Sequence, residues 1–342
     1  MASVDLTVRG GGTFGLCIAW EAARRGARVR LIETVAIGAG ASGGIVGALS
    51  PHVPENWNPK KAFQLDSLLI AEAFWDGVTA ASGLPTGYGR VGRLQPLADE
   101  AAVQLARTRG ETARALWQGR AEWRVIPAAG GAWEPASPSG WVVVDTLSAR
   151  LHPRMASGAL VAAIRAKGGE VVLGEGADEG PVIWATGVQG LRDLTADLGR
   201  PLGDGVKGQA IRLQFDARTA PQLYADSLHI IPHADGTVAI GSTSETVWES
   251  DTGTDGQLET IYARAIAALP VLADAPVVER WAGIRPRAKT RAPLLGAWPG
   301  RPGEYVANGG FKIGFGMAPK VAATMVDLVL EGHDTIPDGF RL

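Results

Sequence analysis

Three glycines near the start of the chain, Gly10, Gly12 and Gly15, follow the spacing G-x-G-x-x-G, and Glu33 comes about twenty residues later. In such a motif the first glycine permits a tight turn, the second lets a pyrophosphate approach the backbone, and the third lets a helix pack against a strand. A carboxylate at Glu33 would accept a hydrogen bond from a ribose hydroxyl and would disfavour a 2′-phosphate. These residues predict a dinucleotide site, and a glycine-rich turn without a ligand is the alternative.

The segments around this motif predict the order strand, turn, helix and strand. Leu6 and Val8 lie in a short apolar run, residues 16–23 provide an apolar helical face, and Gly26 ends the helix. Residues 29–32 then form a second strand. In this βαβ unit the free N–H groups and the positive dipole end of the helix would face the phosphates.

The glycine motif alone fits both NAD and FAD, and two further glycine-rich segments favour FAD. After Glu33 an NAD enzyme normally continues into a helix, whereas this chain has the loop GAGASGGIVGALSPH at residues 38–52. That loop could wrap the ribityl-pyrophosphate arm of a flavin, with the Ser42 hydroxyl at a phosphate. Residues 305–332 predict a strand, a glycine loop and a helix, whose N-terminus near Gly316 would face the pyrimidine edge of the flavin, where negative charge gathers on reduction.

The remaining segments predict further strands of the nucleotide-binding sheet and a second domain. Residues 208–216 and 228–243 alternate as antiparallel strands, with a hairpin turn at Asp235-Gly236. The predicted fold class is α/β, a Rossmann-like FAD-binding domain with a discontinuous substrate domain of mixed antiparallel sheet and helices. The expected helices and strands outside the first unit lie at residues 60–78, 99–118, 160–175 and 180–187. We place the FAD-binding domain at residues 1–55, 143–207 and 281–342, and the substrate domain at residues 56–142 and 208–280.

The composition is that of a globular protein and excludes several classes. Of 342 residues, 46% are hydrophobic and 20% charged, and the net charge of −2 gives no basic surface for nucleic acid. No apolar run approaches the roughly 18 residues that cross a bilayer, so no membrane span is expected. The first strand begins too early for a signal peptide, and Cys17 is the only cysteine, so we expect a cytoplasmic protein without disulfides or a metal site.

Five blocks of the chain resemble the glycine oxidase and D-amino-acid oxidase superfamily of FAD enzymes, over nearly the whole length. In this superfamily a G-x-R-P segment precedes the C-terminal flavin loop, and its arginine binds the substrate carboxylate; the matching residue is Arg285. Lys312 stands where a second cation is frequent, Gly310 replaces the usual preceding histidine, and His229 stands where a tyrosine is common. The blocks are VRGGGTFGL, IETVAIGAGASGGIVGALSPH, VIWATGVQG, HIIPHADGTVAIGST, and WAGIRPRAKTRAPLLG with YVANGGFKIGFGMAP.

The resemblance implies a glycine oxidase-like flavoprotein oxidoreductase that acts on a small carboxylated amine such as glycine, sarcosine or a D-amino acid. A hydride would pass to flavin N5, and the imine would hydrolyse, with oxygen or another electron acceptor reoxidising the flavin. The implied catalytic residues are Arg285, Lys312 and His229. The implied contacts of a non-covalent FAD are Gly10, Gly12, Thr13, Phe14, Gly15, Glu33, Ala41, Ser42, Gly43, Gly44, Ala185, Thr186, Gly187, Gly310, Phe311, Lys312, Ile313 and Gly314.

Other interpretations stay open from the sequence. The GASGGIVGAL segment also resembles the flavin domain of a tRNA-modifying enzyme, which would act on a carboxymethylaminomethyl group of a tRNA base, and a non-catalytic flavoprotein is a third hypothesis. Arg285 could instead bridge domains, and Lys312 could be a solvated loop residue. His52 is a candidate to approach the flavin ring or to form an ordinary hydrogen bond in its loop. His229 and His233 flank a hairpin, and each is a candidate to line the pocket or to be a surface residue. A homo-oligomer is a further expectation.

Overall fold

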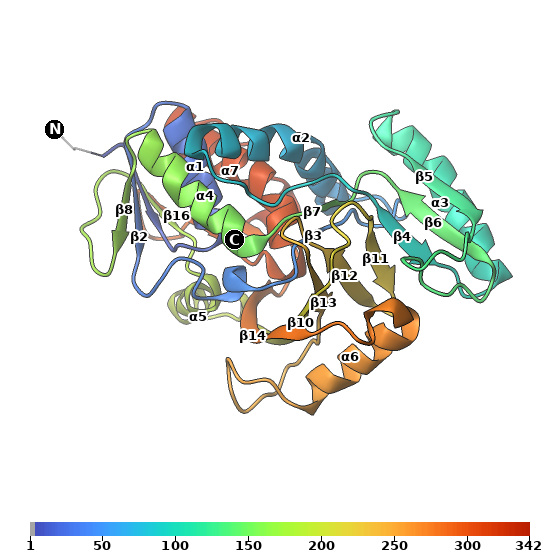
Figure 1. The fold of residues 1–342 in the computed structure, drawn as a ribbon. Helices are drawn as coiled ribbons and strands as arrows, with labels where there is room; N and C mark the ends of the chain where they lie inside the picture. The colour runs from blue at the N-terminus through green and yellow to red at the C-terminus, as the bar shows by residue number, and fades with distance from the viewer. Residues whose placement is uncertain (1–3) are drawn as a thin grey trace.

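The structure is a computed structural model and describes residues 4–342. A six-stranded sheet carries the glycine motif (Figure 1). All neighbouring strands in it are parallel except β15 and β16. The chain passes from β1 to β2 on one side and returns to β9 on the other, so the topological switch point lies between β1 and β9. In spatial order the strands are β15 (Leu294–Ala297), β16 (Glu304–Asn308), β9 (Val182–Trp184), β1 (Leu6–Arg9), β2 (Val29–Glu33) and β8 (Glu170–Leu173).

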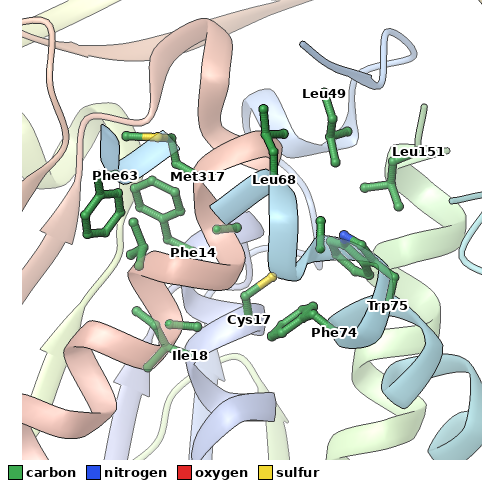
Figure 2. Packing of buried hydrophobic residues seen from close by; sticks show 14 of the residues in the cluster. Phe14, Cys17, Ile18, Leu49, Phe63, Leu68, Phe74, Trp75, Leu151 and Met317 are labelled. Carbon is green, nitrogen blue, oxygen red and sulfur yellow. The ribbon is translucent and has the colours of Figure 1, made fainter. Parts of the chain in front are cut away.

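Helices cover both faces of this sheet because its strands are apolar on both sides. On one face lie α1 (Thr13–Arg24), α2 (Pro59–Ser82), α4 (Pro153–Ala166) and α7 (Gly314–Glu331), which pack against one another. Figure 2 shows their buried core, to which Phe14, Cys17 and Trp75 contribute. The other face carries α5 (Gly187–Leu198), whose Leu191 packs against Val306 of β16. Cys17 is fully buried in this core, as its apolar sequence neighbours indicate.

An eight-stranded sheet forms the second layer of the molecule and is antiparallel except where β11 pairs with β4. Its alternate residues face α6 (Gly256–Ala268), with Ile211, Ile230 and Ile240 in their own core. The other face therefore carries the residues between them. The predicted hairpin is confirmed, because β12 and β13 pair across the turn at Asp235-Gly236. In spatial order the strands are β14 (Val277–Ala288), β10 (Gly203–Gln214), β13 (Thr237–Gly241), β12 (Leu228–Pro232), β11 (Gln222–Ala225), β4 (Arg93–Pro96), β6 (Trp141–Asp145) and β5 (Trp123–Pro127), and α3 (Glu100–Trp117) packs on β5.

The glycine-rich loop of residues 38–52, called the flavin loop below, passes from the end of β2 toward the second sheet. Within it, η1 (Ala41–Gly43) is a single turn, and β3 (Ala48–Leu49) pairs with β7 (Ala149–Arg150). A Cβ at Gly47 would overlap the carbonyl oxygen of Leu151, and one at Gly43 would overlap that of Gly38. The glycines thus let the loop fold tightly on itself and against β7. Three short 3₁₀ turns complete the elements: η2 (Pro270–Leu272), η3 (Phe311–Ile313) and η4 (Asp338–Phe340).

Two strands connect the layers, and this bears on the proposed domains. The boundaries placed at 207/208 and 280/281 fall inside β10 and β14, which both run in the eight-stranded sheet and end beside α5. The boundary at 142/143 likewise falls inside β6 of this sheet. The division into an FAD-binding and a substrate domain stays our proposal, with these three strands divided between them.

One described segment, Phe311–Glu331, is long and apolar enough by length and composition to cross a bilayer. In the structure this segment contains α7, which packs against α1 and α2 and buries Met317, Val321 and Met325. A helix in the core of a globular protein has the same composition. The apolar character of α7 is accounted for by this packing.

Candidate active site

The glycine turn lies at the switch point, between the ends of β1 and β9. Gly10 has a φ of +111°, which L side chains rarely adopt, and a Cβ there would overlap the carbonyl oxygen of Ala185. A Cβ at Gly15 would overlap the carbonyl oxygen of Gly10, so this glycine sets the close approach of α1 to β1. Around Gly12, by contrast, a Cβ would meet only the Ser42 Oγ atom, at 3.3 Å. Gly12 is therefore the open position of the turn, as a pyrophosphate requires.

Glu33 closes one side of the turn. Its Oε2 atom accepts from the Gly11 N–H at 2.7 Å, and its Oε1 atom accepts from the Val35 N–H at 2.8 Å. A carboxylate has about four acceptor positions. The two backbone bonds thus orient Glu33 at the end of β2 and leave lone pairs for ribose hydroxyls.

Helix N-termini fall into two groups in this molecule. The N-cap side chains of α2, α3, α4 and α6 each accept a backbone N–H, whereas the N-cap residues of α1, α5 and α7, which are Gly12, Thr186 and Ile313, provide no such bond. At α1 the flavin loop contributes instead, because Ser42 Oγ accepts from the Thr13 N–H at 2.9 Å. The three helices without their own cap follow β1, β9 and β16, at the carboxyl edge of the parallel sheet. Their N–H groups suit the phosphates and the ring of a flavin dinucleotide.

The C-terminal glycine loop meets the turn after β9. Asn308 donates from Nδ2 to the Gly187 carbonyl at 2.8 Å, and its Oδ1 accepts from the Gly309 N–H at 2.7 Å. Gly310 lies against Phe14 of α1, so a Cβ there would be 2.8 Å from the ring. The structure thus brings together the predicted cofactor residues of the first, middle and last segments. The uncapped turns and the glycine-lined approach fit FAD.

Arg285 is 9% exposed and points from β14 toward the C-terminal loop. Its Nη1 atom donates to Ser242 Oγ at 2.6 Å, and Nη2 donates to the carbonyls of Thr243 at 2.7 Å and Lys207 at 3.1 Å. The Nε atom is buried without a partner. Burial lowers the pKa of Arg285 to about 10, against the opposing effect of Glu245, so the guanidinium is charged at neutral pH. A Cβ at Gly208 would overlap this guanidinium.

Two more cations lie beside Arg285. The Cζ atoms of Arg285 and Arg287 lie 5.6 Å and 5.8 Å from the ring centre of Phe311, and Lys312 Nζ lies 5.7 Å from it. Partial desolvation and the charge of Arg285 lower the pKa of Lys312, although much of its side chain is exposed. The sequence interpretation missed Arg287. Its signal was the two-residue period of β14, which places both arginines on one face.

His229 lies on β12 directly across from Tyr224 of β11, with ring centres 4.9 Å apart. Burial, followed by the charges of Arg93 and Lys312, lowers the pKa of His229 to about 3, so the imidazole is neutral. Its Nδ1 atom is buried without a partner. Arg93 approaches the Tyr224 ring at 5.8 Å and is held by Asp145 at 2.9 Å. Tyr224 was also missed, since nothing in the segment QLYA marks it in the sequence.

The other histidine candidates have partners within the fold. His52 Nδ1 bonds to Gln64 Oε1, and burial lowers its pKa. His233 is fully buried and holds the flavin loop, because its Nε2 bonds to the carbonyl of Ile45 at 2.8 Å. Within residues 4–342 no cluster of three or more His, Cys, Asp or Glu side chains could hold a metal ion. A 240 Å³ cavity lies at Arg93 and Asp145, away from Arg285.

The site combines a glycine turn at the switch point of a parallel sheet, an acidic residue at the end of β2 and a second glycine loop from the C-terminal segment. Together these features are typical of a dinucleotide-binding flavoprotein. The family model described as FAD dependent oxidoreductase matches residues 5–328. The chain belongs to this family, is an oxidoreductase and uses FAD, and the resemblance inferred from the five sequence blocks is confirmed.

Several relatives cover the chain almost completely. Glycine oxidase of Pseudomonas aeruginosa is 28% identical over 361 residues, which cover 98% of this chain and 97% of that protein. Bifunctional protein ThiO/ThiG of Nostoc sp. is 26% identical over 357 residues, and the chain spans about half of it, 53%. The crystal structure of glycine oxidase from Geobacillus kaustophilus matches with a TM-score of 0.84 at 22% identity, over 100% of this chain and 99% of that one, which shows a shared fold.

Proposed function

We propose that this protein oxidises a small carboxylated amine, of the glycine, sarcosine or D-amino-acid type, with FAD as the electron acceptor. The observation that carries this proposal is Arg285, a buried cation whose Nε–H has no partner, on the sheet face that meets the C-terminal glycine loop. Glycine oxidases among the relatives support an amine substrate. When bound, the flavin would take a hydride from the substrate carbon, and the imine product would hydrolyse in water.

The residues of this chain would bind and orient the substrate. Arg285 would hold the carboxylate by a charge-assisted hydrogen bond, its position fixed by Ser242 and Thr243. Neutral His229 and the hydroxyl of Tyr224 would lie on the amine side of the substrate, where an unprotonated imidazole does not repel an ammonium. The uncapped N-terminus of α7 would stabilise negative charge on the reduced ring.

We further propose that the flavin is bound non-covalently, because Cys17 is in the core and the His52 ring is bonded to Gln64. Burial and the charge of Glu21 raise the pKa of the Cys17 thiol well above its usual value, which makes it a poor nucleophile. Oxygen as the acceptor, a cytoplasmic location and a homo-oligomer belong to the same proposal. The tRNA-base alternative is not favoured, since the net charge is −2 and the cations of the site converge on one ring rather than spreading over a surface.

Aerobic turnover tests the proposal. The FAD-loaded protein is supplied with glycine, sarcosine and a panel of D-amino acids while peroxide and the carbonyl product are measured. We expect equal amounts of the two products from at least one carboxylated amine. If neither peroxide nor carbonyl forms with any amine while the flavin stays bound, the result contradicts the proposed function and favours the non-catalytic flavoprotein.

A further inference from the structure

Three cations converge on one aromatic ring at the substrate end of the site. The Phe311 cluster, as we name it, consists of Phe311, Arg285, Arg287 and Lys312. The charged groups lie 5.6 Å, 5.8 Å and 5.7 Å from the ring centre. A ring face attracts a cation by roughly 0.5–1 kcal/mol at an exposed site, which is too little to balance three like charges held together.

No carboxylate of the described chain neutralises the outer two cations. In residues 4–342 neither Arg287 nor Lys312 has an ion pair or a side-chain hydrogen bond, although most arginines of the molecule have one. The cross-strand neighbour of Arg287 is Asp204, but its carboxylate accepts from Arg192 Nε at 3.2 Å and from the Gly205 N–H at 2.7 Å. Among the described residues, the acid whose charge acts on Arg285 is Glu245, and its carboxylate lies 3.8 Å from Lys207 Nζ in a buried network.

One substrate carboxylate accounts for one of these cations. Arg285 is the buried member, with a fixed guanidinium, and the proposed function assigns it to the carboxylate next to the reacting carbon. Negative charge on the reduced flavin would be stabilised by the N-terminus of α7, so it does not account for the other two cations. Arg287 is half-buried and Lys312 is exposed, so both lie on the outer side of Arg285. A second anion fits this position.

We propose that the preferred substrate is an amine with two acid groups, such as an N-carboxymethyl amino acid or an amino dicarboxylate, and that Arg287 and Lys312 bind the second acid group. This inference rests on the proposed function, because it deepens the substrate class of the same site. Arg287 is then a specificity residue that extends the carboxylate site beyond Arg285.

The test compares ligands that differ by one carboxylate. Iminodiacetate is compared with N-ethylglycine in steady-state turnover, and malonate is compared with acetate as an unreactive ligand, with Kd taken from the change in the visible flavin spectrum. We expect at least about a tenfold higher kcat/KM for the diacid amine and at least about a tenfold lower Kd for malonate. Both ratios should decrease with added salt.

Two charge-neutralising variants locate the effect. Arg287→Gln should reduce both diacid-to-monoacid ratios to within about threefold of unity. Lys289→Gln, which removes an exposed charge two residues further along the chain, should leave the ratios at their wild-type values. Ratios near unity in the wild type, or a full diacid preference retained in Arg287→Gln, would overturn the inference. If no amine is oxidised at all, the proposed function fails, and the malonate and acetate constants still decide whether the cluster prefers two charges.

Discussion

The nucleotide end and the substrate end of this site are built in different ways. At the nucleotide end, the turn of Gly10 to Gly15 is shaped by missing side chains, and backbone N–H groups face the ligand position. At the substrate end, Arg285, Arg287 and His229 project from strands of the other sheet, and the Arg285 guanidinium is fixed by Ser242, which comes from a distant segment. The first end is defined by close backbone approach, and the second by charge.

This difference indicates how each end should respond to substitution. The effect of an added methyl group should be large where two backbone segments are in contact, as at Gly15, and small where there is space for a side chain. A change of charge with little change of volume should be severe at Arg285, whose cation is buried, and mild at exposed positions. The nucleotide end is therefore expected to control FAD content, and the substrate end to control ligand affinity with FAD retained.

The largest effect is expected for Gly15→Ala. Its Cβ would overlap the carbonyl oxygen of Gly10. This overlap would push α1 away from β1 and displace the N–H groups that face the phosphates. We expect protein without bound flavin, measured as the ratio of flavin to protein absorbance after purification. Gly158→Ala is the matched control, because nothing lies within 4 Å of its Cβ in α4, and it should keep its flavin. A flavin-loaded Gly15→Ala protein would contradict the expectation that the close approach of the backbones at Gly15 is needed for FAD binding.

Arg285→Lys should have the next largest effect, with FAD content unchanged. A lysine ammonium cannot reproduce the bonds of Nη1 to Ser242 and of Nη2 to Thr243, so the charge is no longer fixed for a carboxylate. We expect about a hundredfold weaker binding of acetate or of a carboxylated amine substrate, in line with roughly 2–5 kcal/mol for a buried charge pair. Kd from flavin spectral titration gives the measurement, and an unchanged Kd would remove Arg285 from the substrate site.

Glu33→Gln should weaken FAD and leave the substrate end as it is. The amide keeps the volume but removes the charge that accepts from the Gly11 and Val35 N–H groups. We expect an FAD Kd raised about 30-fold, since hydrogen bonds to a charged group contribute roughly 1.5–3 kcal/mol. Titration of apoprotein with FAD measures it. If Glu33→Gln instead changed only acetate binding, the division into two ends would be wrong.

The smallest effect is expected for His233→Gln, as a change in how the free energy of unfolding depends on pH. Burial lowers the pKa of His233 to about 4, below the usual value of 6.5, so the unfolded chain binds the proton more tightly. Its contribution to stability is present above pH 6.5 and is lost as the pH falls toward 4. We expect the free energy of unfolding to fall by about 1–2 kcal/mol more in the wild type than in His233→Gln between pH 7 and pH 5. Denaturant titrations at both pH values measure this, and equal losses would contradict it, although His152, with its ring 4.8 Å away, contributes in both proteins.

The sequence predicts the nucleotide end better than the substrate end for a physical reason. Gly10, Gly15 and Glu33 act within one short βαβ unit, so their spacing in the chain determines their spacing in space. The same local rule predicts the β12–β13 hairpin. Tyr224 was missed because its place near Arg285 depends on strand order in the eight-stranded sheet, which contains both β11 and β14. The local sequence around Tyr224 carries no such information, whereas the two-residue spacing of Arg285 and Arg287 was a local signal for Arg287.

Anaerobic mixing shows whether FAD bound to this protein accepts electrons from a carboxylated amine held by Arg285. The FAD-loaded protein is mixed without oxygen with carboxylated amines and with matched amines that lack the carboxylate, such as sarcosine and dimethylamine, while the visible flavin band is followed. We expect at least one carboxylated amine to bleach the flavin band, its matched partner to leave the band unchanged, and bleaching to be much slower in Arg285→Lys. A flavin that stays oxidised with every amine, or that bleaches equally without the carboxylate, would contradict it.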